Sequence, residues 1–315
     1  MSDDMNAEQQ EEQSESGLAE AGRSEKESPE KEFRSGFVTF FGRPNVGKST
    51  LLNKILGEKV TITSDKAQTT RNQVRGVLTT SEHQIVFVDT PGVGKPRSAL
   101  GSRLNATARE ANGDVDVVCF VVDAHTGYGR GDAFLAAQLD PERTVVVMNK
   151  VDGMSPAAVA AQLQAVSEVD ASAFFPVSAQ TGEGLEGLLK ELAARIPIGP
   201  HWYPDEQVRD MPDARWVAEL VREQLMRVTR DEVPHSVATR VTEWEETDKG
   251  PRIRVEILVE RESQKGIVIG HGGEVLKKVG TNVRRQLPKG SHINLVVSVD
   301  RDWHHDLEAI ERLGY

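Results

Sequence analysis

Residues 42–49 read Gly-Arg-Pro-Asn-Val-Gly-Lys-Ser, and this glycine-bounded loop constrains the fold more than any other feature of the chain. A β-branched and aromatic run precedes it at residues 37–41, and helix-forming residues follow it at residues 49–56. In this strand–loop–helix order, the glycines let consecutive backbone N–H groups curl toward one phosphate group. The sequence therefore predicts a phosphate-binding loop that follows a strand of a sheet.

The lysine and the serine that close the loop have separate expected roles. Lys48 supplies a point charge for the β- and γ-phosphates, and Ser49 offers its hydroxyl to Mg²⁺. We therefore expect Mg²⁺ as the cofactor of a bound nucleoside triphosphate. The loop residues expected to contact this nucleotide are Gly42, Arg43, Pro44, Asn45, Val46, Gly47, Lys48, Ser49 and Thr50.

Further short apolar runs continue the strand pattern along the chain. They occupy residues 85–88, 117–122, 144–148 and 173–177, and helix-forming stretches lie between most of them. Strands that alternate with helices favour a parallel sheet covered on both faces. Residues 73–80 lie so close to the run at 85–88 that they predict a hairpin, which adds one antiparallel edge strand. The predicted fold class is α/β, with a doubly wound and mostly parallel sheet.

The tetrapeptide Asp89-Thr90-Pro91-Gly92 directly follows one of these strands. An acid at the end of a strand, paired with a phosphate-binding loop, is expected to anchor Mg²⁺. Gly92 has no Cβ, so its N–H can approach the γ-phosphate closely. We expect the nucleotide to contact this whole segment and the adjoining Val93.

The tetrapeptide Asn-Lys-Val-Asp at residues 149–152 follows the strand predicted at 144–148. Loops at the carboxyl ends of parallel strands bind ligands in such sheets. A carboxylate at Asp152 can accept hydrogen bonds from N1–H and the 2-amino group of guanine, whereas adenine offers neither donor. At the next strand end, the backbone N–H of Ala179 can donate to guanine O6. The residues expected to contact this base are Asn149, Lys150, Val151, Asp152, Ser178 and Ala179.

These motifs resemble those of the small GTPase fold, specifically its translation-factor-like bacterial branch, over about residues 36–196. Gln-Thr-Thr-Arg at residues 68–71 is similar to the first switch of that branch. The resemblance implies that Thr70, with Thr69 as the alternate, closes over Mg²⁺ when GTP is bound. It also implies hydrolysis of GTP to GDP and phosphate. The residues implied in the reaction are Lys48, Thr70, Gly92 and Asn45.

Val93 occupies the position at which Ras-like enzymes carry a glutamine that orients the attacking water. Valine cannot form a hydrogen bond with water, so we expect slow hydrolysis unless another electrostatic element contributes. Asn45 resembles the asparagine with which some of these GTPases hold K⁺ near the phosphates, and such an ion can replace an arginine finger. The alternative is that Asn45 only caps the loop.

Charge is distributed unevenly along the chain. Residues 1–32 contribute −8 to the formal net charge of −11. Residues 1–34 are rich in Glu, Ser, Gln and Ala and cannot bury enough apolar surface to fold. We expect a disordered acidic extension that solubilises the chain, with a regulatory tail as the alternative. Residues 249–290, in contrast, carry ten Lys and Arg against four Asp and Glu, so their local field is positive.

Cysteine usage and hydropathy exclude several classes of protein. The single cysteine, Cys119, lies in an apolar run, so neither a disulfide framework nor a cysteine-based zinc cluster is available. The apolar runs are far shorter than the roughly 18 residues of a membrane span, and we read no secretion signal at the start. We expect a cytoplasmic protein.

Three prolines within residues 196–204 interrupt the first pattern and predict a stiff linker over residues 198–213. The chain should therefore contain a GTPase domain at residues 35–197 and a second, α+β domain at residues 214–315. The elements predicted in the second domain are a helix at 214–230, strands at 235–245 and 252–260, a helix at 273–287, a strand at 293–299, and a closing amphipathic helix with Trp303, Leu307, Ile310 and Leu313 on one side.

Gly-His-Gly-Gly at residues 270–273 resembles the GXXG loop of a KH domain, and the surrounding order of helices and strands resembles the type II KH arrangement. Small residues in such a loop let a nucleic-acid backbone approach, with four bases in the groove beside it. The alternative is a glycine-rich turn whose neighbouring cations form a solvated face. The residues expected to bind RNA are Lys265, Gly270, His271, Gly272, Gly273, Lys277, Lys278, Arg284 and Arg285.

A GTPase domain followed by a type II KH domain resembles the layout of the Era family of bacterial GTPases over nearly all of residues 35–315. The resemblance includes Gly-Pro-x-x-Tyr-Pro at residues 199–204, Arg222-Glu223, and the closing Arg-Leu-Gly-Tyr315. It implies a monomer that binds GTP or GDP and the 3′ end of 16S rRNA. It further implies a role in assembly of the small (30S) ribosomal subunit and peripheral contact with the inner membrane.

Two features depart from the family pattern. The acidic extension is not part of the family core, and His271 stands where a lysine is often found, which weakens one phosphate contact near neutral pH. Two rival functions also fit parts of the sequence. A GTPase coupled to tRNA modification would need a catalytic cysteine near its C-terminus, whereas Cys119 lies in a predicted core strand. A membrane-surface switch would use the C-terminal domain to dock proteins.

Overall fold

The computed structural model describes residues 32–66, 68–96, 98–229 and 236–315. The predicted acidic extension lies outside the described residues as far as position 31, and so do the end of the helix predicted at 214–230 and the start of the strand predicted at 235–245. Arg34, which was assigned to the extension, belongs instead to the first strand. Its guanidinium donates a hydrogen bond to the carbonyl oxygen of Ile196 at 2.7 Å, so this residue is part of the first domain.

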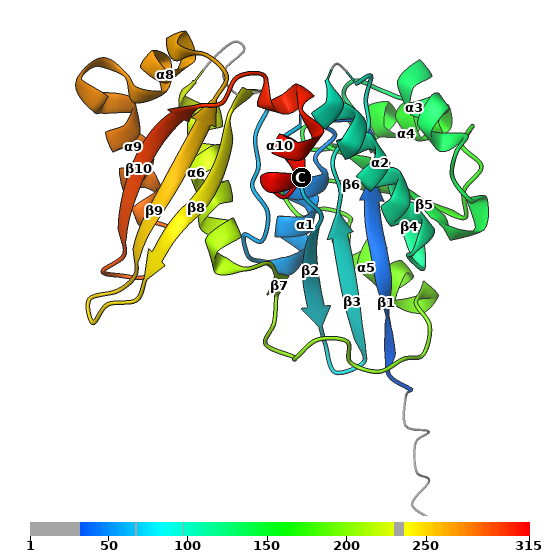
Figure 1. Cartoon of the computed structure of the whole chain (residues 1–315). Helices are drawn as coiled ribbons and strands as arrows, with labels where there is room; N and C mark the ends of the chain where they lie inside the picture. The colour runs from blue at the N-terminus through cyan, green and yellow to red at the C-terminus, as the bar shows by residue number, and fades with distance from the viewer. Residues whose placement is uncertain (1–31, 67, 97, 230–235) are drawn as a thin grey trace, which may run out of the picture. The chain divides into compact units, whose positions relative to one another are not determined.

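A seven-stranded sheet in the described part of the chain forms the centre of the first domain (Figure 1). The strands lie in the order β6-β5-β4-β1-β3-β2-β7. β2 is antiparallel to β3, as the predicted hairpin requires, whereas β6, β5, β4, β1 and β3 are parallel. Their bounds are β1 (Arg34–Phe41), β2 (Val74–Thr79), β3 (His83–Asp89), β4 (Val117–Asp123), β5 (Thr144–Asn149), β6 (Ala173–Val177) and β7 (Arg209–Asp210).

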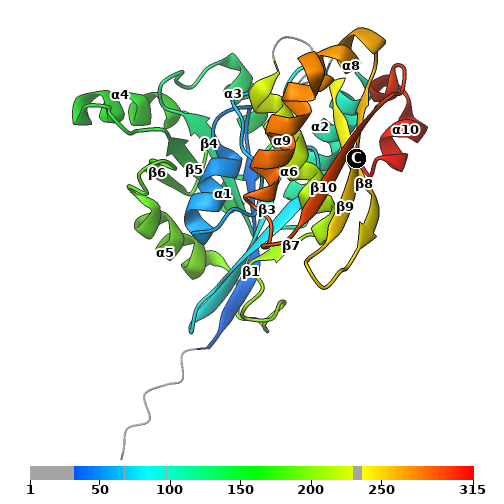
Figure 2. The same cartoon turned by 90° about the vertical axis from the view of Figure 1, so that its left-hand side faces the viewer.

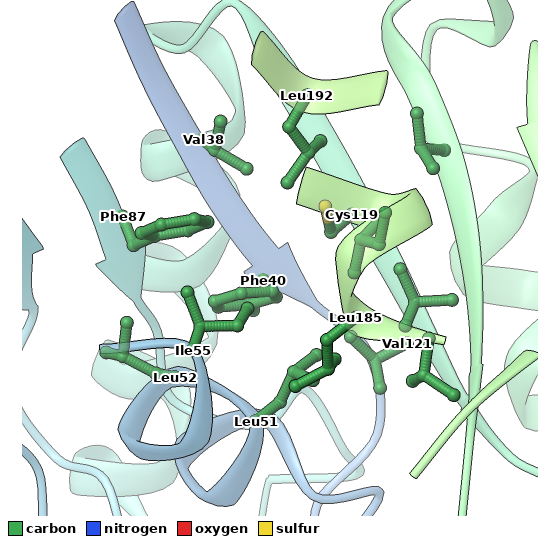
Figure 3. Packing of buried hydrophobic residues seen from close by; sticks show 14 of the residues in the cluster. Val38, Phe40, Leu51, Leu52, Ile55, Phe87, Cys119, Val121, Leu185 and Leu192 are labelled. Atoms are coloured by element: carbon green, nitrogen blue, oxygen red, sulfur yellow. The ribbon is translucent and has the colours of Figure 1, made fainter. Parts of the chain in front are cut away.

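Helices cover both faces of this sheet because its central strands are apolar on both sides. On one face, Leu51 of α1 and Leu192 of α5 lie in one core cluster with Phe40 (Figure 3). On the other face, Ala108 of α2 and Leu135 of α3 belong to a second cluster. The helix bounds are α1 (Lys48–Leu56), α2 (Ala99–Gly113), α3 (Arg130–Ala136), α4 (Pro156–Val166) and α5 (Leu185–Arg195). The layers place the carboxyl ends of the parallel strands at a common edge.

The segment predicted as a linker is partly built into the sheet. β7 pairs antiparallel with β2, which makes it the edge strand. Upstream, Gln84 Oε1 on β3 accepts hydrogen bonds from the backbone N–H groups of Trp202 at 2.7 Å and Tyr203 at 3.0 Å. The prolines disfavour a helix here, as predicted, but the extended backbone satisfies its polar groups on the sheet edge instead of only spanning two domains.

The C-terminal domain contains a three-stranded sheet in the order β10-β9-β8, with β9 parallel to β10 and antiparallel to β8. Leu220 of α6 and Val279 of α9 share a core cluster with Ile257 of β9. The helix α8, which the apolar spacing did not predict, completes the order α6-β8-β9-α8-α9-β10. The bounds are α6 (Asp213–Val228), β8 (Ala238–Glu245), β9 (Arg252–Val259), α8 (Glu262–Ile269), α9 (Glu274–Arg284) and β10 (His292–Val299).

The end of the chain differs from the single amphipathic helix that was predicted. Trp303 lies in a separate 3₁₀ turn, and α10 covers only Leu307–Arg312. Asp306 starts the new helix because its Oδ1 accepts a hydrogen bond from the N–H of Glu308 at 3.0 Å. Trp303, Ile310 and Leu313 are buried as expected, but Leu307 is 62% exposed. Across the described ranges, the helices are too short or too polar to cross a membrane.

Candidate functional site

The phosphate-binding loop connects β1 to α1 and depends on two glycines with positive φ. Gly42 has a φ of 150° and Gly47 has a φ of 99°. A Cβ at Gly42 would lie 2.4 Å from the carbonyl oxygen of Val121, and a Cβ at Gly47 would lie 2.3 Å from Asn149 Nδ2. Both the backbone conformation and the close packing therefore require glycine at these positions.

Lys48 is buried at the first position of α1. Its ammonium group donates hydrogen bonds to the carbonyl oxygens of Gly42 at 3.1 Å and Arg43 at 3.0 Å. Burial lowers the pKa of Lys48 to about 8, although the carboxylate of Asp89 opposes this shift. A desolvated cation inside a backbone loop is suited to receive the negative charge of a phosphate.

Three oxygen-bearing side chains converge beside Lys48. Ser49 Oγ donates to Asp89 Oδ2 at 2.7 Å and lies 2.8 Å from Thr70 Oγ1, which itself donates to Asp89 Oδ2 at 3.2 Å. Asp89 is fully buried, and burial raises its pKa against the hydrogen bond from Ser49 and the charge of Lys48. Its second oxygen, Oδ1, is buried without a hydrogen-bond partner in the described structure.

This group of oxygens fits Mg²⁺, which prefers hard oxygen ligands. Ser49 and Thr70 would hold the ion and Asp89 would supply its counter-charge. The ion, when bound, neutralises charge on the β- and γ-phosphates. Thr69, the alternate metal residue, instead donates its hydroxyl to the carbonyl oxygen of Lys66 at 2.7 Å. The geometry therefore favours Thr70 for the predicted role.

Alanine at each of these adjacent threonines tests that choice with a matched pair of variants. We expect Thr70→Ala to lower Mg²⁺-dependent GTP hydrolysis by about 100-fold, the scale on which one preorganised electrostatic group acts. Thr69→Ala should stay near the wild-type rate because its hydroxyl faces away from Asp89. Hydrolysis measured across a Mg²⁺ titration would show the difference. A larger loss for Thr69→Ala would reverse the assignment.

Gly92 packs directly against the phosphate-binding loop. A Cβ there would lie 2.6 Å from the Cα of Pro44 and 3.1 Å from Lys48 Nζ, so the close approach needs a glycine. The neighbouring Thr90 donates its hydroxyl to the carbonyl oxygen of Phe40 at 2.8 Å, which ties the segment to β1. Val93 is 3% exposed and belongs to the core cluster beneath α2 and α3. Its side chain therefore takes no part in orienting water.

Asn45 adopts a φ of 65° in the phosphate-binding loop. Its Nδ2 donates to the carbonyl oxygen of Asp65 at 2.9 Å, and its carbonyl oxygen accepts from Lys150 Nζ at 2.7 Å. Asn45 thus links the phosphate-binding loop to the segment before Thr70. Neither role expected from the sequence, holding K⁺ or capping the loop, includes this contact.

Asn149 and Asp152 lie at the end of β5, next to the phosphate-binding loop. Asn149 is fully buried, and its Nδ2 donates to the carbonyl oxygen of Val46 at 2.9 Å. Its Oδ1 accepts from the N–H of Ala179 at 3.0 Å, so this bond links the two strand ends at which the base is expected. Asp152 Oδ1 accepts from Ser178 Oγ at 2.7 Å, which fixes the orientation of the carboxylate.

Lys150 crosses between these two motifs. Its ammonium group, besides bonding the backbone of Asn45, pairs with Asp123 Oδ2 at 2.6 Å. Asp123 is partly desolvated, yet the hydrogen bond and charge of Lys150 hold its pKa below the usual range. Val151 is buried in a small cluster with Met148. Lys150 therefore connects the segment expected to bind the base with the phosphate-binding loop. The sequence predicted only that Lys150 contacts the nucleotide.

A cavity of about 560 Å³ lies over these residues. Pro44, Gly47, Lys48, Thr70 and Gly92 line it, and so does Arg227 from α6. Arg227 was not predicted, because nothing in its local sequence distinguishes it from any other arginine on an amphipathic helix. The site thus includes a cation from the C-terminal domain.

The glycine loop at residues 270–273 joins α8 to α9, which meet there in Figure 2. Gly270, Gly272 and Gly273 have φ values of 76°, 55° and 80°. A Cβ at Gly270 would lie 2.5 Å from Val275 Cγ2 and 2.9 Å from its backbone nitrogen, whereas a Cβ at Gly272 would meet no atom within 4 Å. Gly270 therefore shapes the helix junction, and Gly272 presents its backbone to solvent.

The cations predicted to bind RNA occupy the two helices that this loop joins. Lys265 lies on α8 and is half-buried, whereas Lys277, Lys278 and Arg284 on α9 are exposed, as is Arg285 directly after it. His271, at the tip of the loop, is exposed as well. Small loop residues beside exposed cations are the arrangement that a nucleic-acid backbone requires.

Two family models match the chain: a 50S ribosome-binding GTPase model over residues 37–150 and a KH domain model over residues 232–304. The GTPase Era of Clostridium botulinum (strain Eklund 17B / Type B) is 40% identical over 291 residues, which cover 90% of this chain and 99% of that protein. The GTPase Era of Halothermothrix orenii is 40% identical over 290 residues, with the same coverage.

Two solved structures are similar over 90% of this chain and 99% of theirs. An Era variant of Aquifex aeolicus bound to GDP·AlF₄⁻ is 35% identical, with a TM-score of 0.86. Era in complex with MgGDPNP and nucleotides 1506–1542 of 16S ribosomal RNA is 36% identical, with a TM-score of 0.85. These similarities confirm the predicted fold class, a P-loop GTPase domain with a mostly parallel sheet followed by a KH domain.

Proposed function

The chain belongs to the Era family of GTPases, and on this premise we propose that it binds the 3′ end of 16S rRNA through the loop at residues 270–273 and acts in assembly of the 30S subunit. Its enzymatic activity is hydrolysis of GTP, with Mg²⁺ as the cofactor. In this proposal, the nucleotide state of the first domain regulates the RNA affinity of the second.

The exposed glycine loop is the observation that carries the RNA proposal. His271 and Gly272 are both exposed, and no atom within 4 Å would obstruct a Cβ at Gly272, so a phosphodiester backbone has room to approach. The same chain fold occurs in an Era that was solved with nucleotides of 16S rRNA. A basic segment around the loop supplies the charge that such a backbone needs.

The rival is a GTPase switch that acts at the membrane surface through a protein-docking C-terminal domain. The excess of six positive charges over residues 249–290 would also attract anionic lipid headgroups. We propose a cytoplasmic monomer whose contact with the inner membrane is peripheral and secondary to RNA binding. The geometry of the GXXG loop favours RNA as the ligand. Attraction to lipid headgroups requires only positive charge, whereas RNA binding also requires a loop that lets the sugar–phosphate backbone approach.

Binding to RNA and to lipid can be compared under identical salt conditions. We expect a 16S rRNA 3′-end oligonucleotide to bind at least tenfold more tightly than vesicles of anionic phospholipid, since only RNA uses both the loop and the charge. An oligonucleotide of the same length and scrambled sequence controls for nonspecific attraction. Tighter binding to vesicles, or equal binding to both RNAs, would contradict the proposal.

We also propose that Asn45 holds K⁺ near the phosphates. Its amide nitrogen is engaged with Asp65, and the residue lines the nucleotide cavity, so its side-chain oxygen is the group available to an ion. Replacing K⁺ with Na⁺ should slow hydrolysis about tenfold, because oxygens spaced for the larger K⁺ hold the smaller Na⁺ poorly and its charge is then missing from the site. Asn45→Ala should abolish the difference between the two salts. Equal wild-type rates in K⁺ and Na⁺ would defeat this idea.

A further inference from the structure

The chain around Thr70 is held from the C-terminal domain on both sides. Thr69, the preceding residue, has its carbonyl oxygen bonded to Arg222 Nη2 on α6. Arg71, the following residue, donates through Nη1 to the carbonyl oxygen of Val237, next to β8, at 2.7 Å. The residue predicted to meet Mg²⁺ therefore lies between two anchored neighbours.

The surroundings of Arg222 fix the orientation of its guanidinium at this contact. It is fully buried within α6, and its Nε donates to Glu219 Oε1 at 3.0 Å. This ion pair satisfies one edge of the planar guanidinium and fixes its orientation, so that Nη2 is presented to the carbonyl of Thr69. Because the guanidinium is fully buried, loss of this acceptor would leave one of its N–H groups without a replacement from water.

Arg71 is 2% exposed and lies over two neighbouring aromatic rings. Its guanidinium carbon is 5.5 Å from the ring centroid of Trp303 and 5.5 Å from that of Tyr315. Trp303 is itself fixed, since its Nε1 donates to the carbonyl oxygen of Ser236 at 2.9 Å. The cation thus contacts a pair of rings whose centroids are 6.1 Å apart and also bonds a backbone acceptor, and these contacts hold the chain beyond Thr70 in place.

Glu223, next to Arg222, fixes the start of the same segment. It is fully buried, and its Oε1 accepts from the backbone N–H of Thr63 at 3.1 Å. Its Oε2 accepts from Lys59 Nζ at 2.6 Å. These contacts extend the hold of α6 over the first-switch segment, which we define as residues 59–71. The motif Arg222-Glu223 and the closing Tyr315 therefore all act on this one segment.

From these contacts we infer that Arg222 and Arg71 are positioning residues for Thr70, so that the C-terminal domain is a structural part of the Mg²⁺–GTP site. The inference goes beyond the proposed RNA function and does not depend on it. Arg222 holds the carbonyl immediately before Thr70, and Arg71 holds the side chain immediately after it. Together they fix the peptide that carries the Thr70 hydroxyl 2.8 Å from Ser49.

The test variant removes the hydrogen-bond donor of Arg222 without leaving the carboxylate of Glu219 buried and unpaired. Glu219→Gln with Arg222→Met removes both charges together and keeps the size of residue 219 and an apolar stem at residue 222. Both partners are changed because breaking a buried pair on one side alone can unfold the region. Arg240→Met with Glu256→Gln is the matched control, since this arginine–glutamate pair bridges β8 and β9 of the C-terminal sheet.

Hydrogen exchange in the nucleotide-free, Mg²⁺-free protein gives a readout independent of activity. We expect the backbone amides of Thr69–Arg71 to exchange about tenfold faster in the Glu219→Gln, Arg222→Met variant and at the wild-type rate in the control. Arg71→Lys keeps the charge but loses the planar stacking, and it should accelerate the same amides. Unchanged exchange in both test variants would overturn the inference.

A double-mutant cycle with Thr70 separates positioning from general stabilisation. Glu219→Gln, Arg222→Met should lower GTP hydrolysis and raise the Mg²⁺ concentration needed for half-maximal rate. Added to Thr70→Ala, the same pair should cause no further loss, because its effect passes through the missing hydroxyl. If the losses multiply, Arg222 does not act through Thr70 and the inference fails. If the Glu219→Gln, Arg222→Met variant melts at a lower temperature than the control, the same double-mutant cycle is measured with Arg71→Lys in its place.

Discussion

Asp152→Asn is expected to lower the affinity for GTP by roughly 10⁴ and to create affinity for xanthosine triphosphate. In the assigned role the carboxylate would accept hydrogen bonds from guanine N1–H and the 2-amino group, and asparagine would place a donor against them. Ser178 Oγ donates to Asp152 Oδ1 at 2.7 Å, and this bond can persist with the amide oxygen of asparagine. The amide nitrogen would then face the base, where xanthine offers a carbonyl in place of the amino group.

Dissociation constants for both nucleotides, measured on the variant and the wild type, check this exchange of specificity. Asp205→Asn is a suitable control because its carboxylate is 66% exposed and pairs with His201 outside the nucleotide site. The control should bind GTP as the wild type does. Retained GTP affinity in Asp152→Asn would remove the base-recognition assignment from this residue.

His271→Asp with Gly272→Asp is expected to lower the affinity for single-stranded rRNA by at least about 100-fold. The two carboxylates would stand against the phosphates that the loop otherwise admits, and each phosphate contact is electrostatic. The variant should fold, because a Cβ at Gly272 meets no atom within 4 Å and aspartate tolerates its φ of 55° better than most residues. Gly270 and Gly273 stay unchanged because they shape the junction of α8 and α9.

The asparagine pair His271→Asn, Gly272→Asn is the matched control, since it has the same size and backbone preference without the charge. It should keep most of the RNA affinity, and both variants should bind and hydrolyse GTP at near wild-type levels. Wild-type RNA binding should also weaken with salt, with a slope of about −0.7 per phosphate contacted. Full RNA affinity in a folded aspartate pair would show that another surface binds RNA and would reduce the KH loop to a structural likeness.

The nucleotide site was largely predictable because its residues form short motifs at the ends of buried strands. Each motif follows an apolar run that is recognisable as a strand: this holds for Gly42 to Ser49, for Asp89 and for Asn149 to Asp152. Because these strands are parallel, their carboxyl ends lie together. The sequence also favoured Thr70 over Thr69, as the hydrogen bonds do. The order of elements around Gly270 likewise predicted the second domain.

Contacts between distant parts of the chain were not predictable in the same way. Arg222, Arg71 and Arg227 read as ordinary charged residues, because a guanidinium's role depends on what surrounds it in three dimensions. β7 is two residues long, so it has no periodicity to detect. The hydrogen bond from the N–H of Ala179 to Asn149 was not predictable either, because this partner is known only once both strand ends are placed.

Nucleotide state and RNA binding are expected to be linked within one molecule. The first-switch segment contacts both Asp89 in the nucleotide site and Arg222 in the C-terminal domain, so we expect a nucleotide that orders it to change the RNA affinity of that domain. The direct measurement is the dissociation constant for a 16S rRNA 3′-end oligonucleotide with saturating GDP and with a nonhydrolysable GTP analogue, at one salt concentration. We expect the two dissociation constants to differ by about 5- to 150-fold, and equal values would contradict a link between the two domains.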